Sequence, residues 1–226
     1  MDKSCAAVIV AAGSATRMNG IDKIMSELGG IPMILRTVRA MAASEKIDEI
    51  VVVTREDLIE KVTEICRCER KFRKAIPGGN SRAESVMNGI RSVNTDFVAI
   101  HDGARPFVTT RIIDETIKEA SEYGAAAPAI PVKDTIKVAR EHRIVSTPDR
   151  STLFAVQTPQ VFDRMKIISA LEDAMHHQIP LTDDCSAAEA AGIEVFLTEG
   201  SNENIKITTP VDLAFCEAIL KWREQH

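Results

Sequence analysis

The sequence predicts an α/β protein whose mostly parallel sheet is covered by helices on both faces. Short apolar runs, typical of buried strands, alternate along the chain with segments whose apolar residues recur at helical spacing. Strands that alternate with helices form right-handed βαβ units, and such units build parallel sheets. No break in composition, repeat or low-complexity tract divides the 226 residues, so we expect a single domain over residues 1–226.

The first predicted strand, residues 5–11, is a compact apolar run that leads into a glycine turn at Gly13. We interpret this run as a strand and not as a signal peptide, because no small-residue cleavage site follows it. Pro32 suits the first turn of a helix, and apolar residues from Ile34 to Met41 follow at helical spacing.

The next strands are each followed by a helix start. Residues 47–54 (IDEIVVVT) are strand-like, and we expect Thr54 to cap a helix whose apolar face runs over residues 58–65. Residues 72–77 form a further predicted strand that ends at two glycines. Ser81-Arg-Ala-Glu84 is a capping-box sequence, which predicts that a helix begins there.

The alternation continues in the second half of the chain. Residues 96–101 (DFVAIH) are another predicted buried strand, and residues 110–123 a helix. Apolar runs predict strands over residues 125–132 and 194–198, and residues 210–223 form a closing helix.

Residues 133–157 interrupt this alternation of strands and helices. The segment is charged, with short Val and Ile runs on either side of Arg140-Glu141-His142-Arg143, which predicts an exposed hairpin. An isolated hairpin is only marginally stable. We therefore expect this segment to pack on another surface, and a second copy of the protein is the candidate.

Composition excludes several classes of protein. A net charge of −5 and a pI near 5.6 argue against a general nucleic-acid binder, which would present a basic face. No apolar run approaches the ~18–20 residues of a membrane span. The five cysteines are odd in number and scattered, which favours reduced thiols in a cytoplasm.

Three predicted strands end in loops suited to an anion. In open α/β sheets ligands bind outside the carboxyl ends of the strands, so we expect Ala11–Gly13, Gly78-Gly79 and His101–Pro106 to share one rim. Small residues allow backbone NH groups to approach an anion closely. The charged residues of these loops are Arg17, Lys23, Arg82, Arg105 and the single acid Asp102. A carboxylate there could hold Mg²⁺, which takes oxygen ligands and usually bridges substrate phosphates.

The first loop matches neither of two standard phosphate-binding motifs. It lacks G-x-G-x-x-G, because only Gly13 falls at the turn, and it lacks G-K-[ST], because Arg17 and Lys23 lie well downstream. An NAD-dependent oxidoreductase is further disfavoured because the strand that ends at Thr54 has no ribose-binding acid at its tip. A non-catalytic nucleotide-binding protein remains an alternative, although the presence of Arg17, Lys23, Asp102 and Lys206 together speaks against it.

Seven motifs occur in a specific order between Ala11 and Leu213. They are AAG-x-x-x-RM…K, GG-x-x-R-x-x-S-V, HD-x-ARP, P-V-x-DT-x-K, TPQ-x-F, TDD-x-SA-x-E and N-I-K-x-T-x-P-x-DL. In this set and order the sequence resembles the 2-C-methyl-D-erythritol 4-phosphate cytidylyltransferase family of the non-mevalonate isoprenoid pathway. The glycine turn with Arg and Lys is shared by many nucleotidyltransferases, whereas the ordered set is specific.

The resemblance implies a Rossmann-like, three-layer nucleotidyltransferase fold. It also implies an enzyme that uses Mg²⁺ to transfer CMP from CTP to a polyol phosphate and that releases pyrophosphate. The implied catalytic residues are Arg17, Lys23 and Lys206, and the implied metal ligand is Asp102. The implied nucleotide-binding residues are Ala11, Ala12, Gly13, Ser14, Gly79, Arg82, Ser85, Asp102, Gly103 and Ala104. The implied substrate-binding residues are Asp102, Arg105, Thr135, Arg150, Thr158, Thr182 and Lys206.

The resemblance also implies that residues 133–157 form an arm for a homodimer, and it leaves open whether Thr135 and Arg150 serve their own site or the partner's. A cytidylyltransferase for another polyol phosphate, such as ribitol 5-phosphate, is the alternative. The chain departs from the family at two positions: Ala15 stands where a second glycine is frequent, and Asp22 precedes Lys23.

His101 lies beside Asp102 at a strand end, where a general base could stand. We expect a structural role for it instead. The attacking group in the implied reaction is a phosphate monoester, whose second pKa is near ~6, so that it needs no base at neutral pH.

Overall fold

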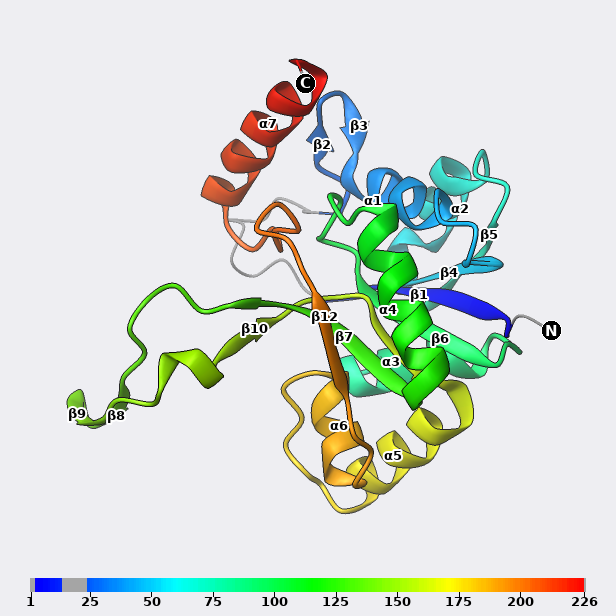
Figure 1. Ribbon diagram of the computed structural model, residues 1–226. Coiled ribbons are helices and arrows are strands. Elements are labelled where there is room, and N and C mark those ends of the chain that lie inside the picture. The colour runs from blue at the N-terminus through cyan, green and yellow to red at the C-terminus, as the bar shows by residue number, and fades with distance from the viewer. Residues whose placement is uncertain (1–2, 14–23, 226) are drawn as a thin grey trace.

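A computed structural model describes residues 3–13 and 24–225 (Figure 1). Its centre is an eight-stranded sheet with the strand order β10-β7-β11-β6-β1-β4-β5, in which β12 also pairs with β7. These strands are β1 Cys5–Ala11, β4 Glu49–Thr54, β5 Phe72–Pro77, β6 Phe97–Asp102, β7 Ala125–Pro131, β10 Phe154–Val156, β11 Gln160–Asp163 and β12 Phe196–Glu199. Two short pairs lie outside the sheet: β2 Glu27–Leu28 with β3 Ile31–Pro32, and β8 Val138–Arg140 with β9 Arg143–Ser146.

The order of the parallel strands reverses beside β1. The chain extends the sheet from β1 to β4 and β5 on one side and then returns to place β6 on the other side, with every one of these pairs parallel. Val10 lies opposite Val53 on one neighbour and Asp102 on the other, so the carboxyl ends of β1, β4 and β6 are level. Such a reversal is where open α/β sheets form their ligand crevice.

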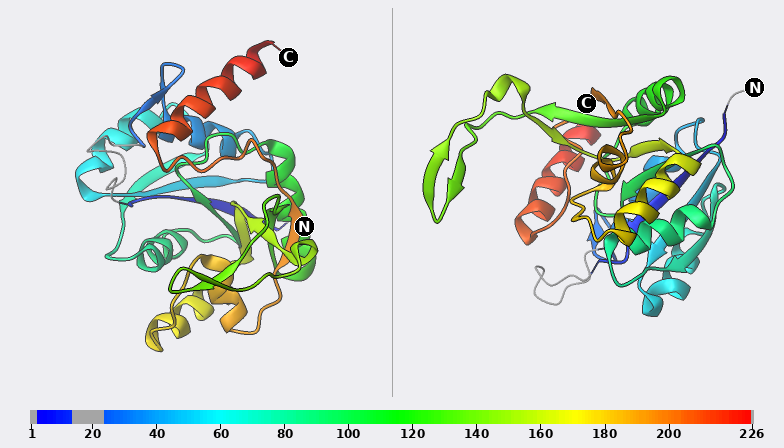
Figure 2. Two further views of the ribbon diagram at one scale, coloured as in Figure 1. Left: turned by 90° about the vertical axis from the view of Figure 1, so that its left-hand side faces the viewer. Right: turned by 90° about the horizontal axis from the view of Figure 1, so that it is seen from below.

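Helices cover both faces of the sheet, so the predicted three layers are confirmed (Figures 1 and 2). The helices of one face are α1 Met33–Ala42, α2 Ile59–Cys66 and α4 Thr110–Tyr123; those of the other are α3 Arg82–Arg91, α5 Arg164–His176 and α6 Asp184–Ala190. Successive side chains of a strand point to opposite faces. Accordingly, Ala7 and Ile9 of β1 join the first core, while Ala6 joins the second.

The last helix, α7 Pro210–Gln225, belongs to a third and smaller apolar cluster. Its buried Cys216 packs there with Leu28, Met33 and Phe107, which places α7 beside the β2–β3 pair. Within residues 3–13 and 24–225, no helix is both long enough and apolar enough to cross a membrane.

All six predicted strands form, each with ends within two residues of the predicted ones. Among the strands of the main sheet and the α-helices, four were not predicted: β10, β11, α5 and α6. The two strands are three and four residues long and run antiparallel to β7 and β6, so they carry little pattern of their own. The sequence does contain a signal for α5, because its buried residues Ile167, Ala170, Leu171 and Ala174 recur at helical spacing.

Of the two predicted helix caps, one is wrong. The hydroxyl of Thr54 is buried without a hydrogen-bond partner in the described part of the chain. A short 3-10 turn, η1 Glu56–Leu58, with Arg55 at its N-cap, precedes α2 instead. The cap at Ser81 is confirmed, because its hydroxyl accepts a hydrogen bond from the Glu84 amide at 3.1 Å.

The predicted hairpin forms a protruding arm (Figure 1). The β8–β9 pair lies at its tip, where Glu141 and His142 have positive φ values of 48° and 63°. After a short 3-10 turn, η2 Arg150–Thr152, the returning chain joins the sheet as β10 beside β7. The arm leaves apolar side chains exposed, among them Ile144 at 67% and Val145 at 56%.

Candidate active site

The carboxyl ends of β1, β5 and β6 border a cavity of about 440 Å³. The lining residues are Val10, Ala11, Ala12, Gly13, Ile24, Gly79, Asn80, Ser81, Arg82, Ser85, Asp102, Ala104 and Lys206. The expectation that the three strand-end loops share one rim is therefore confirmed. Lys206 reaches the same cavity from the segment between β12 and α7.

Small residues allow these loops to approach one another. A Cβ atom on Gly78 would lie 2.4 Å from the Cβ of Ala12, and one on Gly103 would lie 2.9 Å from the Cβ of Ala11. Both distances are shorter than real Cβ contacts, so a larger residue would push the loops apart. The hydroxyl of Ser85 also holds the second loop, since it accepts a hydrogen bond from the Gly79 amide at 3.0 Å.

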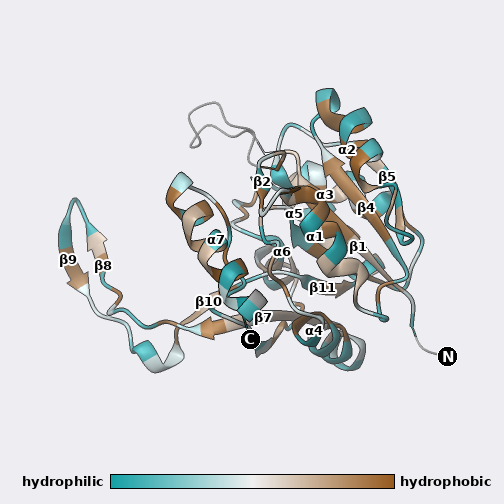
Figure 3. Ribbon diagram, turned by 90° about the horizontal axis from the view of Figure 1, so that it is seen from above, coloured by the Kyte–Doolittle hydropathy of each residue, from teal (hydrophilic) through white to brown (hydrophobic). Residues whose placement is uncertain are grey.

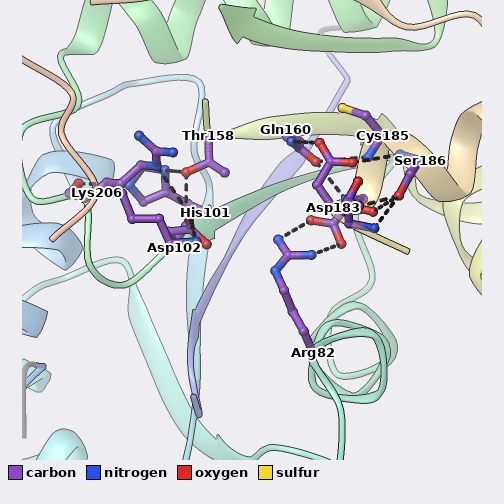
Figure 4. Close-up of polar contacts among 12 residues, drawn as sticks. Arg82, His101, Asp102, Thr158, Gln160, Asp183, Cys185, Ser186 and Lys206 are labelled. Carbon is purple, nitrogen blue, oxygen red and sulfur yellow. Dashed lines mark hydrogen bonds and ion pairs between the residues drawn. The ribbon is translucent and has the colours of Figure 1, made fainter. Parts of the chain in front are cut away.

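Asp102, the last residue of β6, is the charged centre of the cavity (Figure 4). Its Oδ2 lies 2.9 Å from the Lys206 Nζ and 3.2 Å from the Arg105 Nε. Burial alone would raise the pKa of Asp102, but Lys206 and Arg105 outweigh it and lower that pKa to about 2. The carboxylate is therefore ionised at neutral pH.

Arg82 is held at the opposite wall of the cavity. Its Nη1 and Nη2 donate to the two carboxylate oxygens of Asp184, both at 2.7 Å (Figure 4). Burial alone would lower the pKa of Arg82, and the Asp184 carboxylate outweighs this and raises it. In turn, Gln160 accepts hydrogen bonds from the Asp184 and Cys185 amides at 3.0 and 3.1 Å, which anchors the start of α6.

Behind Asp102 lies His101, which is fully buried. Its Nδ1 contacts the Thr158 hydroxyl at 3.0 Å, and its Nε2 contacts the carbonyl oxygen of Arg105 at 3.1 Å. Burial lowers the pKa of His101 to about 4. Both ring nitrogens are thus engaged by the protein, and the imidazole is neutral at physiological pH, which supports the structural role expected for it.

A network of amide side chains fixes the segment that carries Lys206. Gln157 exchanges two hydrogen bonds with the backbone of Ser201, at 2.8 and 3.2 Å. The side-chain amide of the buried Asn204 donates to the Thr158 carbonyl at 2.9 Å, and the backbone carbonyl oxygen of Asn204 accepts from the Arg105 Nη1 at 2.7 Å. These contacts bring Lys206 to Asp102 across 104 positions of sequence.

Comparison with known proteins identifies the chain's relatives. The family model described as 2-C-methyl-D-erythritol 4-phosphate cytidylyltransferase matches residues 5–222. This chain belongs to that family. It is accordingly a nucleotidyltransferase enzyme, and the assignment does not favour the ribitol 5-phosphate alternative.

Individual members of the family align over nearly the full chain. A protein named 2-C-methyl-D-erythritol 4-phosphate cytidylyltransferase from Caldanaerobacter subterraneus subsp. tengcongensis is 47% identical over 223 residues, which cover 95% of this chain and 98% of the relative. The protein of the same name from Clostridium botulinum strain Langeland is 45% identical, with 95% and 96% covered. The crystal structure of 4-diphosphocytidyl-2C-methyl-D-erythritol synthase from Anaerococcus prevotii superposes with a TM-score of 0.88 at 29% identity, with 97% of each chain covered.

The remaining residues implied by the resemblance fall into four groups. Ser14, Arg17 and Lys23, together with the departures at Ala15 and Asp22, lie outside the described residues. Gly103 and Thr158 are buried next to Asp102 and are not among the lining residues of the cavity. Thr182 lines a neighbouring cavity of about 290 Å³, which shares Ser81 and Arg82 with the first. Thr135 and Arg150 lie on the arm, where the Arg150 Nη1 donates to the Lys133 carbonyl at 3.0 Å.

Four supporting residues were missed: Gln157, Gln160, Asp184 and Asn204. Three of them stand inside motifs that carried the family resemblance, TPQ-x-F, TDD-x-SA-x-E and N-I-K-x-T-x-P-x-DL. The signal was therefore present. Nothing in the sequence indicated which distant side chain each would contact.

Asp102 fits a Mg²⁺ ion that is bound mainly by substrate oxygens. Such an ion usually takes one or two carboxylates from the protein and its other ligands from phosphates and water. Both ion pairs of Asp102 use Oδ2, which leaves Oδ1 outside them. Among the described residues, no group of three or more His, Cys, Asp or Glu side chains forms a protein-only metal site.

The buried His101 should make stability depend on pH. Between pH 6.5 and about pH 4 the unfolded chain binds a proton on this imidazole and the folded chain does not, so acidification favours unfolding. The folded protein should lose about 3 kcal/mol from this group between pH 7.5 and pH 4. Urea unfolding of wild type and His101→Gln at several pH values measures the effect. The gap between their unfolding free energies should narrow as pH falls, and parallel curves would contradict the assignment.

Proposed function

We propose that this chain transfers CMP from CTP to 2-C-methyl-D-erythritol 4-phosphate, releases pyrophosphate and so supplies isoprenoid precursors. The observation that carries the proposal is the cavity at the strand-order reversal, which combines closely packed small-residue loops with Asp102, Arg82 and Lys206. Backbone NH groups and cations suit a triphosphate, and the names of the family members specify the acceptor.

The chemistry is an in-line displacement at the α-phosphate. A non-bridging oxygen of the acceptor's phosphate monoester forms a bond to the α-phosphorus, and the bond from that phosphorus to the oxygen bridging the β-phosphate breaks. Pyrophosphate leaves with the electron pair. Because the acceptor phosphate is largely ionised at pH 7, no general base is required. The barrier is instead the approach of two anions, which a site lowers by neutralising charge and aligning the groups.

We assign the cations to that task. Arg17 and Lys23 would stabilise the negative charge that develops on the α-phosphate and on pyrophosphate. Lys206, which lines the cavity with a side chain that is 41% exposed, would hold the acceptor phosphate. Arg82, which lines the cavity together with Ser85 and Gly79, would contact the nucleotide.

Arg105 would support the acceptor's side of the cavity through its ion pair with Asp102. The resemblance assigns Thr182 to the acceptor, and this residue lines the neighbouring cavity together with Arg82. The resemblance implies the same contact for Thr158, whose side chain does not line the main cavity in the described part of the chain. When bound at Asp102, Mg²⁺ would neutralise phosphate charge and orient the triphosphate.

We further propose a homodimer in which the arm of one protomer completes the site of the other. The arm exposes several large apolar side chains: Ile136, Val138, Ile144, Val145, Phe154 and Val156. On the same side of the molecule, α7 exposes Val211, Phe215 and Trp222 (Figures 1 and 3). Association across a two-fold axis would bury this apolar surface. Thr135 and Arg150, which do not line the cavity of their own chain in the part described, would then reach the partner's acceptor phosphate.

The cytoplasm is the compartment we propose for the enzyme. All five cysteines carry free thiols, and four of them are buried. Scattered free thiols are typical of proteins from a reducing compartment.

Pyrophosphate release will test the proposed reaction. The purified protein should release pyrophosphate with CTP and 2-C-methyl-D-erythritol 4-phosphate, and at a much lower rate with the other three NTPs or with ribitol 5-phosphate. Lys206→Ala should lower kcat/KM by on the order of 10²–10³, because it removes a cation that contacts transferring phosphates. Equal rates with both acceptors would overturn the assigned substrate, and no release with any pair would overturn the reaction.

Replacement of the central carboxylate will test the metal. Asp102→Asn should raise the Mg²⁺ concentration needed for half-maximal rate and lower kcat by on the order of 10², since a neutral amide is a weaker ligand and leaves two cations unpaired. Asp173→Asn, which changes an exposed carboxylate on α5, is the control and should behave like wild type. Full turnover in excess chelator would show that no metal is needed.

Mixing inactive chains will test the shared site. If Arg150 acts in the partner's site, a heterodimer of Arg150→Ala and Lys206→Ala chains contains one site with both residues intact, so mixing should restore part of the activity. Arg140→Ala removes an exposed charge from the same arm and should stay active as its own homodimer. Failure of mixing to restore activity would contradict the placement of Arg150 across the interface, and light scattering that shows a fully active monomer would overturn the dimer.

A further inference from the structure

Asp102 and Arg105 are joined not only by their ion pair but also through two buried side chains. Thr158 is 3% exposed and His101 is fully buried. The Thr158 hydroxyl lies 3.1 Å from the Asp102 amide nitrogen and 3.0 Å from the His101 Nδ1. The His101 Nε2 lies 3.1 Å from the Arg105 carbonyl oxygen, and the Arg105 Nε returns to the Asp102 carboxylate at 3.2 Å. The four residues therefore form a closed ring of contacts, and Figure 4 labels three of them, His101, Asp102 and Thr158.

The chemistry of the groups fixes the direction of every hydrogen bond in this ring. A carbonyl oxygen can only accept, so the His101 Nε2 must carry the hydrogen that points to Arg105. The Thr158 hydroxyl has one hydrogen to donate and already accepts from the Asp102 amide, so it donates to the His101 Nδ1, its other partner. A backbone amide can only donate, so the Asp102 amide must donate to the Thr158 oxygen. Each of the three assignments is consistent with the other two.

We propose that Thr158 and His101 are positioning residues, which hold the Asp102 carboxylate and the Arg105 guanidinium in register through this ring of directed hydrogen bonds. Its consequence for catalysis rests on the proposed function. Neither residue lines the cavity in the described structure, and the contacts of the Thr158 hydroxyl are with the protein. This assignment gives Thr158 a different role from the direct substrate contact that the family resemblance implies.

The ring explains why two buried polar side chains, Thr158 and His101, lie next to the charged pair of Asp102 and Arg105. The Asp102 carboxylate is attracted by two cations on different segments, Arg105 and Lys206, so its orientation would otherwise depend on those two side chains. The Asp102 amide donates to the Thr158 hydroxyl and the His101 Nε2 donates to the Arg105 carbonyl oxygen, and these two contacts fix the backbone of both residues. Buried networks whose members are all satisfied hold their members rigidly.

Nitrogen NMR of the imidazole tests the ring in the substrate-free protein, without any assay of activity. In wild type, two-bond correlations from the ring protons should show His101 as the neutral form with hydrogen on Nε2, and His101→Gln identifies its signals among the five histidines. Thr158→Val, which replaces the hydroxyl with a methyl group, should shift the Nδ1 resonance. Thr158→Ser, which keeps the hydroxyl, should leave it close to wild type. A hydrogen on Nδ1 in the wild-type protein would overturn the ring outright.

Kinetics then separate positioning from direct contact. Thr158→Val should lower kcat by on the order of 10- to 100-fold, since it leaves a buried amide and a ring nitrogen unsatisfied, and Thr158→Ser should recover most of the loss. Thr116→Val, which removes an equally buried hydroxyl on α4, is the control for general damage and should leave both kcat and the His101 signals unchanged. A Thr158→Val variant that raises only the acceptor KM and leaves the Nδ1 resonance unmoved would mean direct contact and overturn the proposal. If the NMR result holds and no pyrophosphate is released by wild type, the proposed function fails while the ring stands.

Discussion

The carboxylate of Asp102 can remain ionised inside the protein only because two cations lie against it. A buried charge without partners is strongly unfavourable, and the ion pairs with Lys206 and Arg105 turn the pKa shift from upward to downward. This requirement constrains distant parts of the chain. The loop after β6 must turn back on itself to present Arg105, and the segment before α7 must cross to the same edge of the sheet to present Lys206.

A single short segment, residues 157–160, holds these parts together. Gln157 bonds the backbone that leads to Lys206, Thr158 bonds the Asp102 amide, and Gln160 anchors the start of α6, whose Asp184 pairs with Arg82. All three side chains are buried and make hydrogen bonds to the protein. The two walls of the cavity and its charged centre are thus set by neighbouring residues, although the cations that they place are 124 positions apart in sequence, from Arg82 to Lys206.

The parallel half of the sheet could be predicted because β1, β4 and β6 contain apolar runs and β5 ends at two glycines. The same pattern brought the three strand-end loops to one rim, since parallel strands present their carboxyl ends at one edge. Partners across the fold could not be predicted. Arg82 and Asp184 are 102 positions apart, and local sequence holds no information on which carboxylate a given cation meets. Thr54 shows a different kind of failure. Its side chain was expected to cap a helix, but it is buried at the end of β4 instead.

The late position of Lys206 has a consequence for biogenesis. The residues of strands β1, β4, β5 and β6 and of the loops that follow them have all been synthesised once residue 106 has left the ribosome. The cavity then still lacks Lys206. Hydrogen bonds of residues 201–204 hold Lys206 beside Asp102. The chain beyond Lys206 is fixed by α7, which packs against Leu28 and Met33. The charge balance around Asp102 is therefore reached only after residues 201–206 have been synthesised, well after the strands that border the cavity.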